Sequence, residues 1–491
     1  MIAGEPLTTG WLLTVAGLLM LASVLFSRPS ERIGFPAVLL FLGIGLLASL
    51  WLPADFADHS LAFRIGAVGL VLILFDGGLN TSWRAARPHL APAAVLATAG
   101  VAGTAAVVAV AARLLGLDWP EALLIGAIVS STDAAAVFSA LRGSNVQLRR
   151  RVGATLELES GLNDPMAVIL TITLTGLLLD AGEFGWFAFI ADIFMQLAVG
   201  LAAGLAVGWL GQQLLQRVRV PAAGLYPAMT LALALLAFGI PTLFLGSGFL
   251  AVYVAALMLG NRRLPYRAGI LRVHDALAWL GQITMFLVLG LLAIPGLLAA
   301  SGLMGIALGL VLALLARPLV VALCLLPFRF EKAETAFIAW TGLRGAVPIL
   351  LASYPVMSGV EGALELFHLV FFIVVFNAVI PGATISWAVN RFRVERAGLP
   401  RPTPVLEITS TEALPVRVLS FLIEPAAVVT GSRVEDLPLP DGVDILLLVR
   451  RGRVLAARES TVLEAGDHIH LLISPEQINA VSLLFGLREE D

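Results

Sequence analysis

Long apolar stretches recur along most of this 491-residue chain, and they limit what the chain can fold into. Hydrophobic residues make up 59% of the chain and charged residues only 13%, which is typical of a membrane protein. A helix that crosses a bilayer needs about 20 mainly apolar residues, and by that measure we expect about 13 transmembrane helices. The predicted segments centre near Ala16, Ile44, Val68, Thr98, Val129, Ile169, Val199, Ala232, Val252, Phe286, Leu308, Gly345 and Val374. The sequence therefore predicts an all-α polytopic membrane protein.

Basic residues in the loops indicate the orientation, because Arg and Lys gather in cytoplasmic loops. With the N-terminus outside, almost all of them fall on one side, in loops such as SRPSERIG and RGSNVQLRRRVG. Acidic loops such as PADFADHS fall on the other side. The odd number of segments then places the C-terminus in the cytoplasm. The first apolar stretch lacks a basic leader and a clear cleavage site, so we expect a retained helix.

Two segments in corresponding positions contain small and polar residues at mid-span. If the seventh segment is a link, two sets of six remain, and their equivalent members run in opposite directions, as in two inverted repeats. The fifth member of one set contains SSTDAAA and that of the other contains TGLRGAVP. Each pattern is typical of a helix interrupted half-way. Paired interruptions of this kind mark the substrate site of a secondary transporter, since irregular backbone at that depth needs surrounding protein or water.

Several ionisable residues lie within the predicted spans, where each costs a few kcal/mol. They are Asp76, Asp133, Glu159, Asp164, Arg317 and Arg344. Ser160, Asn163 and Asp164 share one helix face and offer a hydroxyl, an amide and a carboxylate, whose oxygens suit Na⁺ or K⁺. The alternative for this face is a polar cluster that holds helices together.

Asp133 stands in the SSTD interruption and faces the N-terminus of the half-helix that follows. It either contributes to a cation site, together with Thr132, or caps the half-helix, and the two roles are compatible.

The remaining charges have less certain partners. Arg344 keeps its proton and needs a partner inside the membrane, for which Glu159 is the candidate. Asp76 either lines an inner cavity or caps an interrupted helix. Arg317 also lies within a span, where it is interpreted as a structural arginine or one that reaches toward the interface, and its role is left open.

A buried carboxylate can explain exchange without ATP. In a low-dielectric cavity it holds either a proton or a cation, because the proton removes the charge that the cation needs. Asn163 adds no charge, so a single titrating carboxylate at Asp164 predicts one proton per monovalent cation and no net charge movement. The chain has no Walker-type loop for ATP and no Cys/His spacing for zinc, and its one cysteine, Cys324, excludes an internal disulfide.

Four motifs resemble those of the monovalent cation:proton antiporter superfamily, in its NhaP-like branch. They are LFDGGLNT, STDAAAVFS, ELESGLNDPMAV and GLRGAVPI, in the family's order. The resemblance implies about 13 spans, an extracellular N-terminus and a homodimer in which a core domain moves against a dimerisation domain.

The same resemblance implies roles for individual residues. Asp164 would be the essential cation and proton carboxylate, and Asn163 its neutral partner, where electrogenic relatives have Asp. Thr132, Asp133 and Ser160 would complete the cation shell, with the monovalent cation held at Asp164, Asp133 and Ser160. Glu159 and Arg344 would form a structural ion pair. Many relatives have Glu where this chain has Asp76, so its contact with the ion is open.

The composition changes after residue 395, which predicts a membrane domain over 1–395 and a small α+β cytoplasmic domain over 402–491. DILLLVRRGRVLAA predicts two strands joined by a turn, LEAGDHIHLLISP a turn and a strand, and PEQINAVSLLFG a closing helix. This tail resembles the TrkA-C (RCK-C) domain, which implies a small regulatory ligand, unless the domain only stabilises the protein. No GxGxxG follows a strand, so we expect neither NAD nor another cofactor.

The predicted function is a secondary active antiporter that exchanges a monovalent cation for protons. The tail favours K⁺, and Na⁺ is a close second. A ligand-gated cation channel is the alternative, but it would need repeated filter segments that the sequence lacks. An intramembrane enzyme using Asp133 and Asp164 would need a substrate cleft, which no pattern indicates. We therefore expect no enzymatic activity and no nucleic-acid partner, and the Arg-rich composition favours a bacterial inner membrane.

Overall fold

The computed structural model describes two compact units, a larger helical one and a smaller one that contains the sheet. The described residues are 7–33, 37–51, 58–142, 148–179, 185–262, 264–395, 417–423, 427–440, 442–450, 453–474 and 477–485. The expected domains, 1–395 and 402–491, meet within residues 396–416, which lie outside these ranges.

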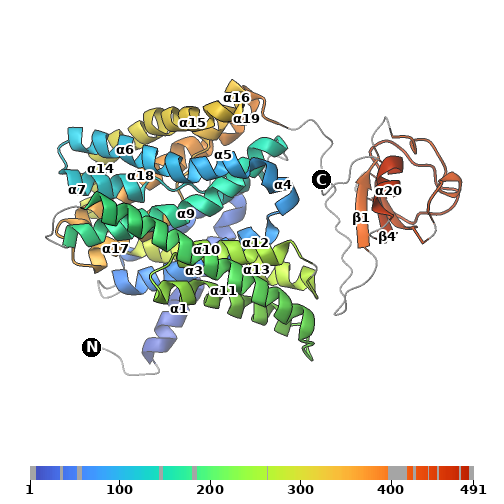
Figure 1. The fold of residues 1–491 in the computed structure, drawn as a ribbon, viewed down its shortest axis with the longest axis horizontal. Coiled ribbons are helices and arrows are strands. Elements are labelled where there is room, and N and C mark those ends of the chain that lie inside the picture. The colour runs from blue at the N-terminus through green and yellow to red at the C-terminus, as the bar shows by residue number, and fades with distance from the viewer. Residues whose placement is uncertain are drawn as a thin grey trace. The chain divides into compact units, whose positions relative to one another are not determined.

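The larger unit is built from apolar helices (Figure 1). Among the described residues, nine helices are long and apolar enough to cross a membrane, and four shorter apolar helices accompany them. The shorter ones are α2 (Ala37–Ser49), α7 (Trp119–Ile128), α12 (Gly248–Gly260) and α17 (Ala346–Met357). The uninterrupted long ones are α1 (Leu7–Ile33), α3 (His59–Asn80), α9 (Arg150–Leu179), α10 (Trp186–Arg217), α11 (Leu225–Leu243), α13 (Arg267–Leu291) and α18 (Ala363–Ala383). Every predicted segment centre falls on a helix or in a break beside one, which confirms the all-α polytopic fold.

Both predicted interruptions are present. The first separates α7 from α8 (Ala134–Arg142), and the second separates α16 (Lys332–Trp340) from α17. The two leading half-helices also begin alike, since each starts with a capping box, Asp118 with Glu121 and Glu331 with Glu334. Similar starts and similar breaks in corresponding segments agree with the predicted inverted repeats.

The segments that precede the two interrupted helices share a second irregularity. Leu96–Gly100 forms a π-helical stretch between α5 (Leu90–Val95) and α6 (Val101–Leu114), and Leu312–Ala316 forms another between α14 (Pro295–Val311) and α15 (Arg317–Leu325). The first π stretch packs against α15, and the second packs against α6. Such stretches are frequent at functional sites, and the second directly precedes Arg317. The short α4 (Trp83–Ala86) and α19 (Ile385–Phe392) complete the unit.

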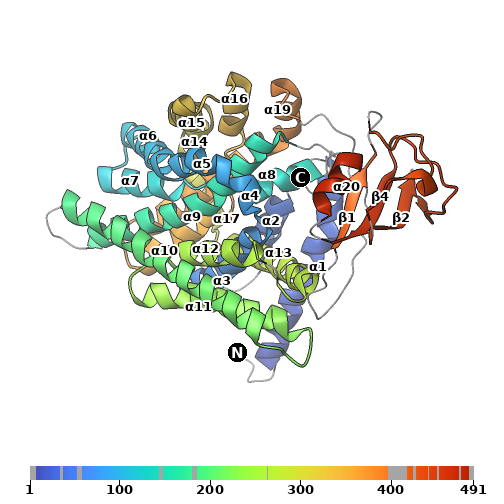
Figure 2. The same cartoon turned by 45° about the vertical axis from the view of Figure 1, so that its right-hand side comes forward.

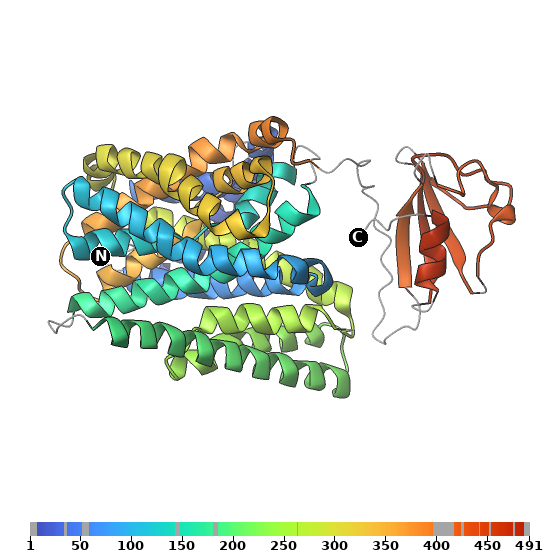
Figure 3. The ribbon, with the colours of Figure 1, turned by 45° about the horizontal axis from the view of Figure 1, so that its top comes forward.

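The helices of the larger unit form two groups, which Figures 1 and 3 show on opposite sides of it. The panel group consists of α3 and α10 to α13, and the crossing group consists of α5 to α9 and α14 to α18. Within the panel group, Gly69 of α3 and Gly281 of α13 permit backbone contact, because a Cβ on Gly69 would lie 3.0 Å from the Gly281 carbonyl oxygen. The crossing group contains both interrupted helices and α9, and α9 packs against α3, α10 and α12 of the panel group.

The smaller unit is a four-stranded antiparallel sheet with one helix against it (Figure 2). The strands β1 (Arg417–Leu422), β2 (Asp444–Arg450), β3 (Arg453–Leu455) and β4 (His468–Ile473) have the order β1-β4-β2-β3, and α20 (Ile478–Phe485) follows. Phe421, Leu448, Ile469 and Phe485 meet in its core. The two strands of DILLLVRRGRVLAA, the following strand and the closing helix are confirmed, whereas β1 is an additional strand.

One arginine joins strand β2 of this unit to the turn before β4. Arg450 on β2 donates to both carboxylate oxygens of Asp467, at 2.8 and 2.7 Å, and also to Glu464 and to the Val462 carbonyl, both at 2.7 Å. Asp467 is 1% exposed. This acidic surrounding raises the pKa of Arg450, chiefly through the hydrogen bonds to Asp467. The pair therefore secures the turn before β4.

Arg450→Ala should destabilise the smaller unit by about 2 to 4 kcal/mol, because it leaves the buried Asp467 carboxylate without its partner. Hydrogen–deuterium exchange on the full-length protein should show much faster exchange over 417–485. The matched control is Arg433→Ala, which removes an exposed ion pair with Glu435 and should cost less than about 0.5 kcal/mol. Equal protection in the two variants would contradict the assigned role of Arg450.

Candidate functional site

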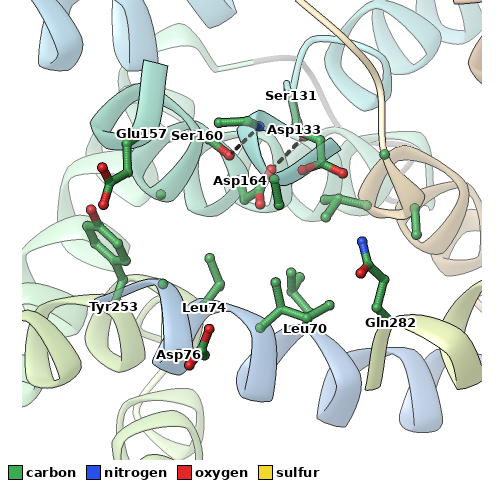
Figure 4. A pocket seen from close by; sticks show the side chains of 18 of the residues that line it. Leu70, Leu74, Asp76, Ser131, Asp133, Glu157, Ser160, Asp164, Tyr253 and Gln282 are labelled. Carbon is green, nitrogen blue, oxygen red and sulfur yellow. Dashed lines mark hydrogen bonds between the residues drawn. The ribbon is translucent and has the colours of Figure 1, made fainter. Parts of the chain in front are cut away.

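A cavity of about 440 Å³ lies between the crossing group and the panel group. Five polar side chains lie on its crossing-group wall, and Figure 4 shows them facing the panel group. Those side chains are Ser131, Asp133, Glu157, Ser160 and Asp164. The opposite wall includes the apolar residues Leu70, Ile73, Leu74, Met285 and Phe286, with Asp76, Asn80, Thr81, Tyr253 and Gln282 as its polar members.

The two helix breaks meet at this wall. The Asp133 N–H donates to the Leu343 carbonyl at 2.9 Å, so that each break completes the other's backbone hydrogen bonding. Arg344 Nη1 donates to the carbonyl oxygens of Ser130 and Ser131, at 3.0 and 2.5 Å. These carbonyls follow the C-terminal end of α7, where a cation is stabilised by the partial negative charge of the helix end. Arg344 therefore supplies the positive charge that stabilises the C-terminal end of α7.

Asp133 compensates the opposite helix ends. Its Oδ1 accepts from the Ala136 N–H at 3.1 Å, which caps α8. Its carboxylate also lies against Gly345, the residue before α17, where a Cβ would be only 2.3 Å from Asp133 Oδ2. The carboxylate thus lies at the N-terminal ends of two half-helices and lines the cavity. The expected capping role of Asp133 is present, and its position on the cavity wall leaves its role in cation binding as a prediction.

Asp164 on α9 is buried, with 7% of its surface exposed, and it lines the same wall. Ser131 Oγ donates to Asp164 Oδ1 at 2.7 Å. In the described part of the chain no basic side chain pairs with this carboxylate. Ser160, one turn earlier, uses its hydroxyl oxygen to accept from the Ala134 N–H at 3.1 Å. Asp164 therefore has one side-chain hydrogen-bond donor and no basic partner among the described residues.

Thr132 and Asn163 are neighbours of this wall, but they are not among the described residues that line the cavity. Asn163 Nδ2 donates to Thr132 Oγ1 at 2.5 Å, and this bond joins the first break to α9. Asn163 is fully buried, and its Oδ1 has no hydrogen-bond partner among the described residues. The pair positions Asp164, and Asn163 keeps one oxygen available.

The expected ion pair between Glu159 and Arg344 is wrong. Glu159 instead binds Arg317, whose Nη1 and Nη2 lie 2.5 and 2.9 Å from the two carboxylate oxygens. Both side chains are buried, and Arg317 Nη2 also reaches the Ile338 carbonyl near the C-terminal end of α16, at 3.5 Å. The reason is that Arg344 is occupied by the first half-helix, whereas Arg317 lies between α9 and α16.

Asp76 lies on the opposite wall of the cavity, within the continuous helix α3. Of the two roles expected for it, cavity lining is therefore correct and capping of an interrupted helix is wrong. Asn80 Nδ2 donates to its Oδ1 at 3.0 Å.

Sequence reasoning missed several polar residues of the cavity, namely Ser131, Glu157, Thr81, Tyr253 and Gln282. Ser131 could have been found from the SSTD break, since it precedes two residues already selected. Glu157 could have been found as a carboxylate two turns before Asp164 on the same helix face. Nothing in the local sequence distinguishes Tyr253 or Gln282 from residues that only pack.

The comparisons with known proteins agree with this architecture. Residues 18–391 match the model of the family described as "Sodium/hydrogen exchanger, transmembrane", and residues 418–486 match that of the TrkA-C domain. The chain is 41% identical over 474 residues to the K⁺/H⁺ antiporter NhaP of Alkalimonas amylolytica, covering 95% of this chain and 82% of that protein. It is 41% identical over 484 residues to NhaP2 of Shewanella oneidensis, named a K⁺/H⁺ antiporter, covering 97% and 83%.

A solved structure shares the fold. The sodium proton antiporter MjNhaP1 from Methanocaldococcus jannaschii superposes with a TM-score of 0.65 at 24% sequence identity, covering 78% of this chain and 98% of that one.

The partner of Glu159 can be tested by double-mutant cycles with Glu159→Gln, Arg317→Gln and Arg344→Gln. Each single change should lower the apparent melting temperature of the purified protein in detergent. The double change at Glu159 and Arg317 should be little worse than either single change, with a coupling of about 2 to 4 kcal/mol, because each single change strands a buried charge. The losses for Glu159 and Arg344 should nearly add. A larger coupling in this second pair would contradict the observed ion pair.

Proposed function

The chain belongs to the sodium/hydrogen exchanger family, and from that premise we propose that it exchanges K⁺ for protons, one for one, at Asp164. As a member of this family it is a cation:proton antiporter, and neither a channel nor an enzyme. The choice of K⁺ is supported by the names of the relatives and by the TrkA-C domain. Na⁺, which the family description names, is the alternative substrate.

One observation supports the site above all others: Asp164 is a buried carboxylate on a cavity wall, and no described basic residue pairs with it. The two buried arginines nearby are engaged elsewhere, Arg317 with Glu159 and Arg344 with backbone carbonyls. A buried charge without a partner is costly, so Asp164 is stable when a proton or a cation neutralises it. The two ligands exclude each other, and this exclusion couples their movements.

The opposite wall of the cavity explains why Asp164 does not move past the panel group when it holds neither a proton nor a cation. Asp164 faces a panel that includes Leu70, Leu74 and Phe286. Sliding a bare carboxylate past this apolar surface would remove it from water without compensation, whereas the protonated or cation-bound form is neutral. Movement of the crossing group against the panel group would then always carry either a cation or a proton. It would not occur with an empty site.

In this proposed cycle we assign Asp133 a constant charge. Its carboxylate is held by the N-terminal ends of α8 and α17, through the Ala136 N–H and beside Gly345, so backbone dipoles stabilise the ionised form. Asn163 contributes no charge. Asp164 is then the one group whose charge state differs between the outward and return movements, and this makes the exchange electroneutral. Ser131, Ser160 and Asp133 supply further oxygens for the cation at the wall, with Thr132 and Asn163 in support and Asp76 approaching from the panel.

We place the protein in a bacterial inner membrane, with the N-terminus outside and the TrkA-C domain in the cytoplasm, where it binds a small regulatory ligand. This orientation is supported by the basic loops. A homodimer is supported by the helices that bury little of their surface within one chain. Only 6% of the apolar window of α1 and 17% of that of α10 are buried, which leaves apolar surface for lipid or a second copy.

Asp164→Asn should abolish exchange, since an amide neither releases a proton nor supplies the charge that binds the cation. In everted membrane vesicles with a pH gradient, adding K⁺ should release protons through the wild type, and the variant should lose at least about 100-fold of the rate. The measurement is repeated with Na⁺ and Li⁺, and the cation that triggers the largest response identifies the substrate.

Asp192→Asn provides the matched control for Asp164→Asn. Asp192 is another carboxylate inside a span, hydrogen-bonded to Thr173 and Gln196, and it is not among the described residues that line the cavity. The amide can keep these contacts, so exchange should persist in this variant. Undiminished exchange in Asp164→Asn would move the site elsewhere, and no response of the wild type to any cation would refute the antiport proposal.

Charge movement tests the stoichiometry separately. Purified protein reconstituted on a solid-supported membrane should give no transient current on addition of K⁺ at saturating concentration, while a pH-sensitive dye in matched vesicles reports proton movement. A sustained current that scales with the dye signal would show unequal exchange and would contradict the assignment of a single titrating carboxylate.

A further inference from the structure

A second carboxylate lies on the cavity face of α9, and the exchange reaction described above does not use it. Glu157 precedes Asp164 by two helical turns, so the two side chains lie on one helix face, about 10 Å apart along the axis. Glu157 is nearer the end of the cavity where α3 terminates at Asn80. In the described part of the chain no basic side chain pairs with it.

The hydrogen bond that Glu157 accepts can be exchanged for another. Thr81 Oγ1 lies 2.6 Å from Glu157 Oε1 and 2.8 Å from the Gly77 carbonyl oxygen. A hydroxyl has one hydrogen, so Thr81 donates to one of these acceptors at a time. When its hydrogen points to Gly77, the Thr81 oxygen and the Glu157 carboxylate both present lone pairs. This arrangement can bind a cation without leaving the Thr81 hydrogen unbonded.

Tyr253 of α12 supplies a third oxygen. Its ring lies against Gly161, where a Cβ would be 2.5 Å from the ring, and only 3% of the residue is exposed. The hydroxyl lines the cavity close to Thr81 and Glu157 and makes no hydrogen bond of normal geometry with the described residues. Figure 4 shows it pointing toward the Glu157 carboxylate. A buried hydroxyl without a partner is unfavourable, so this position is suited to a polar guest.

We propose that Glu157, Thr81 and Tyr253 form a second binding site for the transported monovalent cation, on the path between the Asn80 end of the cavity and Asp164. The inference rests on the proposed exchange of a cation for protons. A carboxylate and two hydroxyl oxygens are ligands that hard cations prefer. The cation stops at this site before it reaches Asp164, two turns further along α9.

The three residues also come from both helix groups. Glu157 belongs to the crossing group, Tyr253 to the panel group, and Thr81 is the residue that ends α3 of the panel group. A cation held by all three joins the groups in the arrangement of this structure. The site therefore loads only in this arrangement and must release the cation before α9 moves against the panel.

Removal of the Glu157 charge should weaken cation capture without stopping exchange. In everted vesicles, Glu157→Gln should raise the half-saturating K⁺ concentration about fivefold to tenfold and leave the maximal rate within about twofold. Gln keeps an oxygen that accepts from Thr81, so a purely structural contact would survive this change. Tyr253→Phe should raise the same concentration by about twofold. Wild-type kinetics in Glu157→Gln would overturn the proposal.

Binding can also be measured without transport, in the Asp164→Asn background. K⁺ should raise the melting temperature of purified Asp164→Asn protein by about 2 °C relative to N-methylglucamine at equal ionic strength. The increase should disappear in the double variant Asp164→Asn/Glu157→Gln and persist in Asp164→Asn/Asp192→Asn, which loses a membrane carboxylate outside the cavity lining. No stabilisation of Asp164→Asn by K⁺, or equal stabilisation of both double variants, would overturn the second site. Failure of the wild type to exchange any cation would instead refute the proposed function, while this binding result would stand.

Discussion

The half-helix ends that meet inside the larger unit must be neutralised, and the rest of the site depends on how this is achieved. A broken helix presents partial charges at its new termini, and in a membrane no bulk water is present to screen them. Arg344 compensates the end of α7, Arg317 reaches the end of α16, and Asp133 lies at the starts of α8 and α17. The charged residues within the predicted spans, whose burial costs free energy, are thus required by the helix breaks.

This compensation also determines which carboxylate is left to react. Arg317 also forms an ion pair with Glu159, and neither arginine is among the described residues that line the cavity. If either guanidinium faced Asp164, the ion pair would exclude both the proton and the cation. The geometry that stabilises the broken helices therefore also leaves the Asp164 carboxylate without a basic partner. The structural charges lie at the helix breaks, and the charge assigned to transport lies on the cavity wall.

The fold could be predicted from the sequence because its signals, apolar length and local residue clusters, can be read along the chain without knowing any contact. Apolar length locates the spans, and the clusters SSTDAAA and TGLRGAVP locate the breaks, which the structure contains at Val129–Asp133 and Thr341–Gly345. Partners were harder to predict. From the sequence, Arg344 is the predicted partner of Glu159, whereas the actual choice depends on which helix end each arginine faces, and this is not visible in the sequence. Asp76 was left between two roles for the same reason. Tyr253 was missed because its role depends on Gly161, a residue of another helix that makes room for its ring.

Four carboxylates line the cavity, and a one-for-one exchange must still be explained with all of them present. The number of protons exchanged depends only on groups whose charge state differs between the two directions of movement. Asp133 lies at two helix N-termini, which favour its ionised form, and Asp76 lies on the panel wall rather than on the crossing group. Glu157 can bind a cation while the cavity is open and release it before the groups move, so its state is the same in both directions. The site can therefore concentrate cations with several carboxylates and still exchange a single proton, provided that only the charge state of Asp164 differs between the two directions of movement.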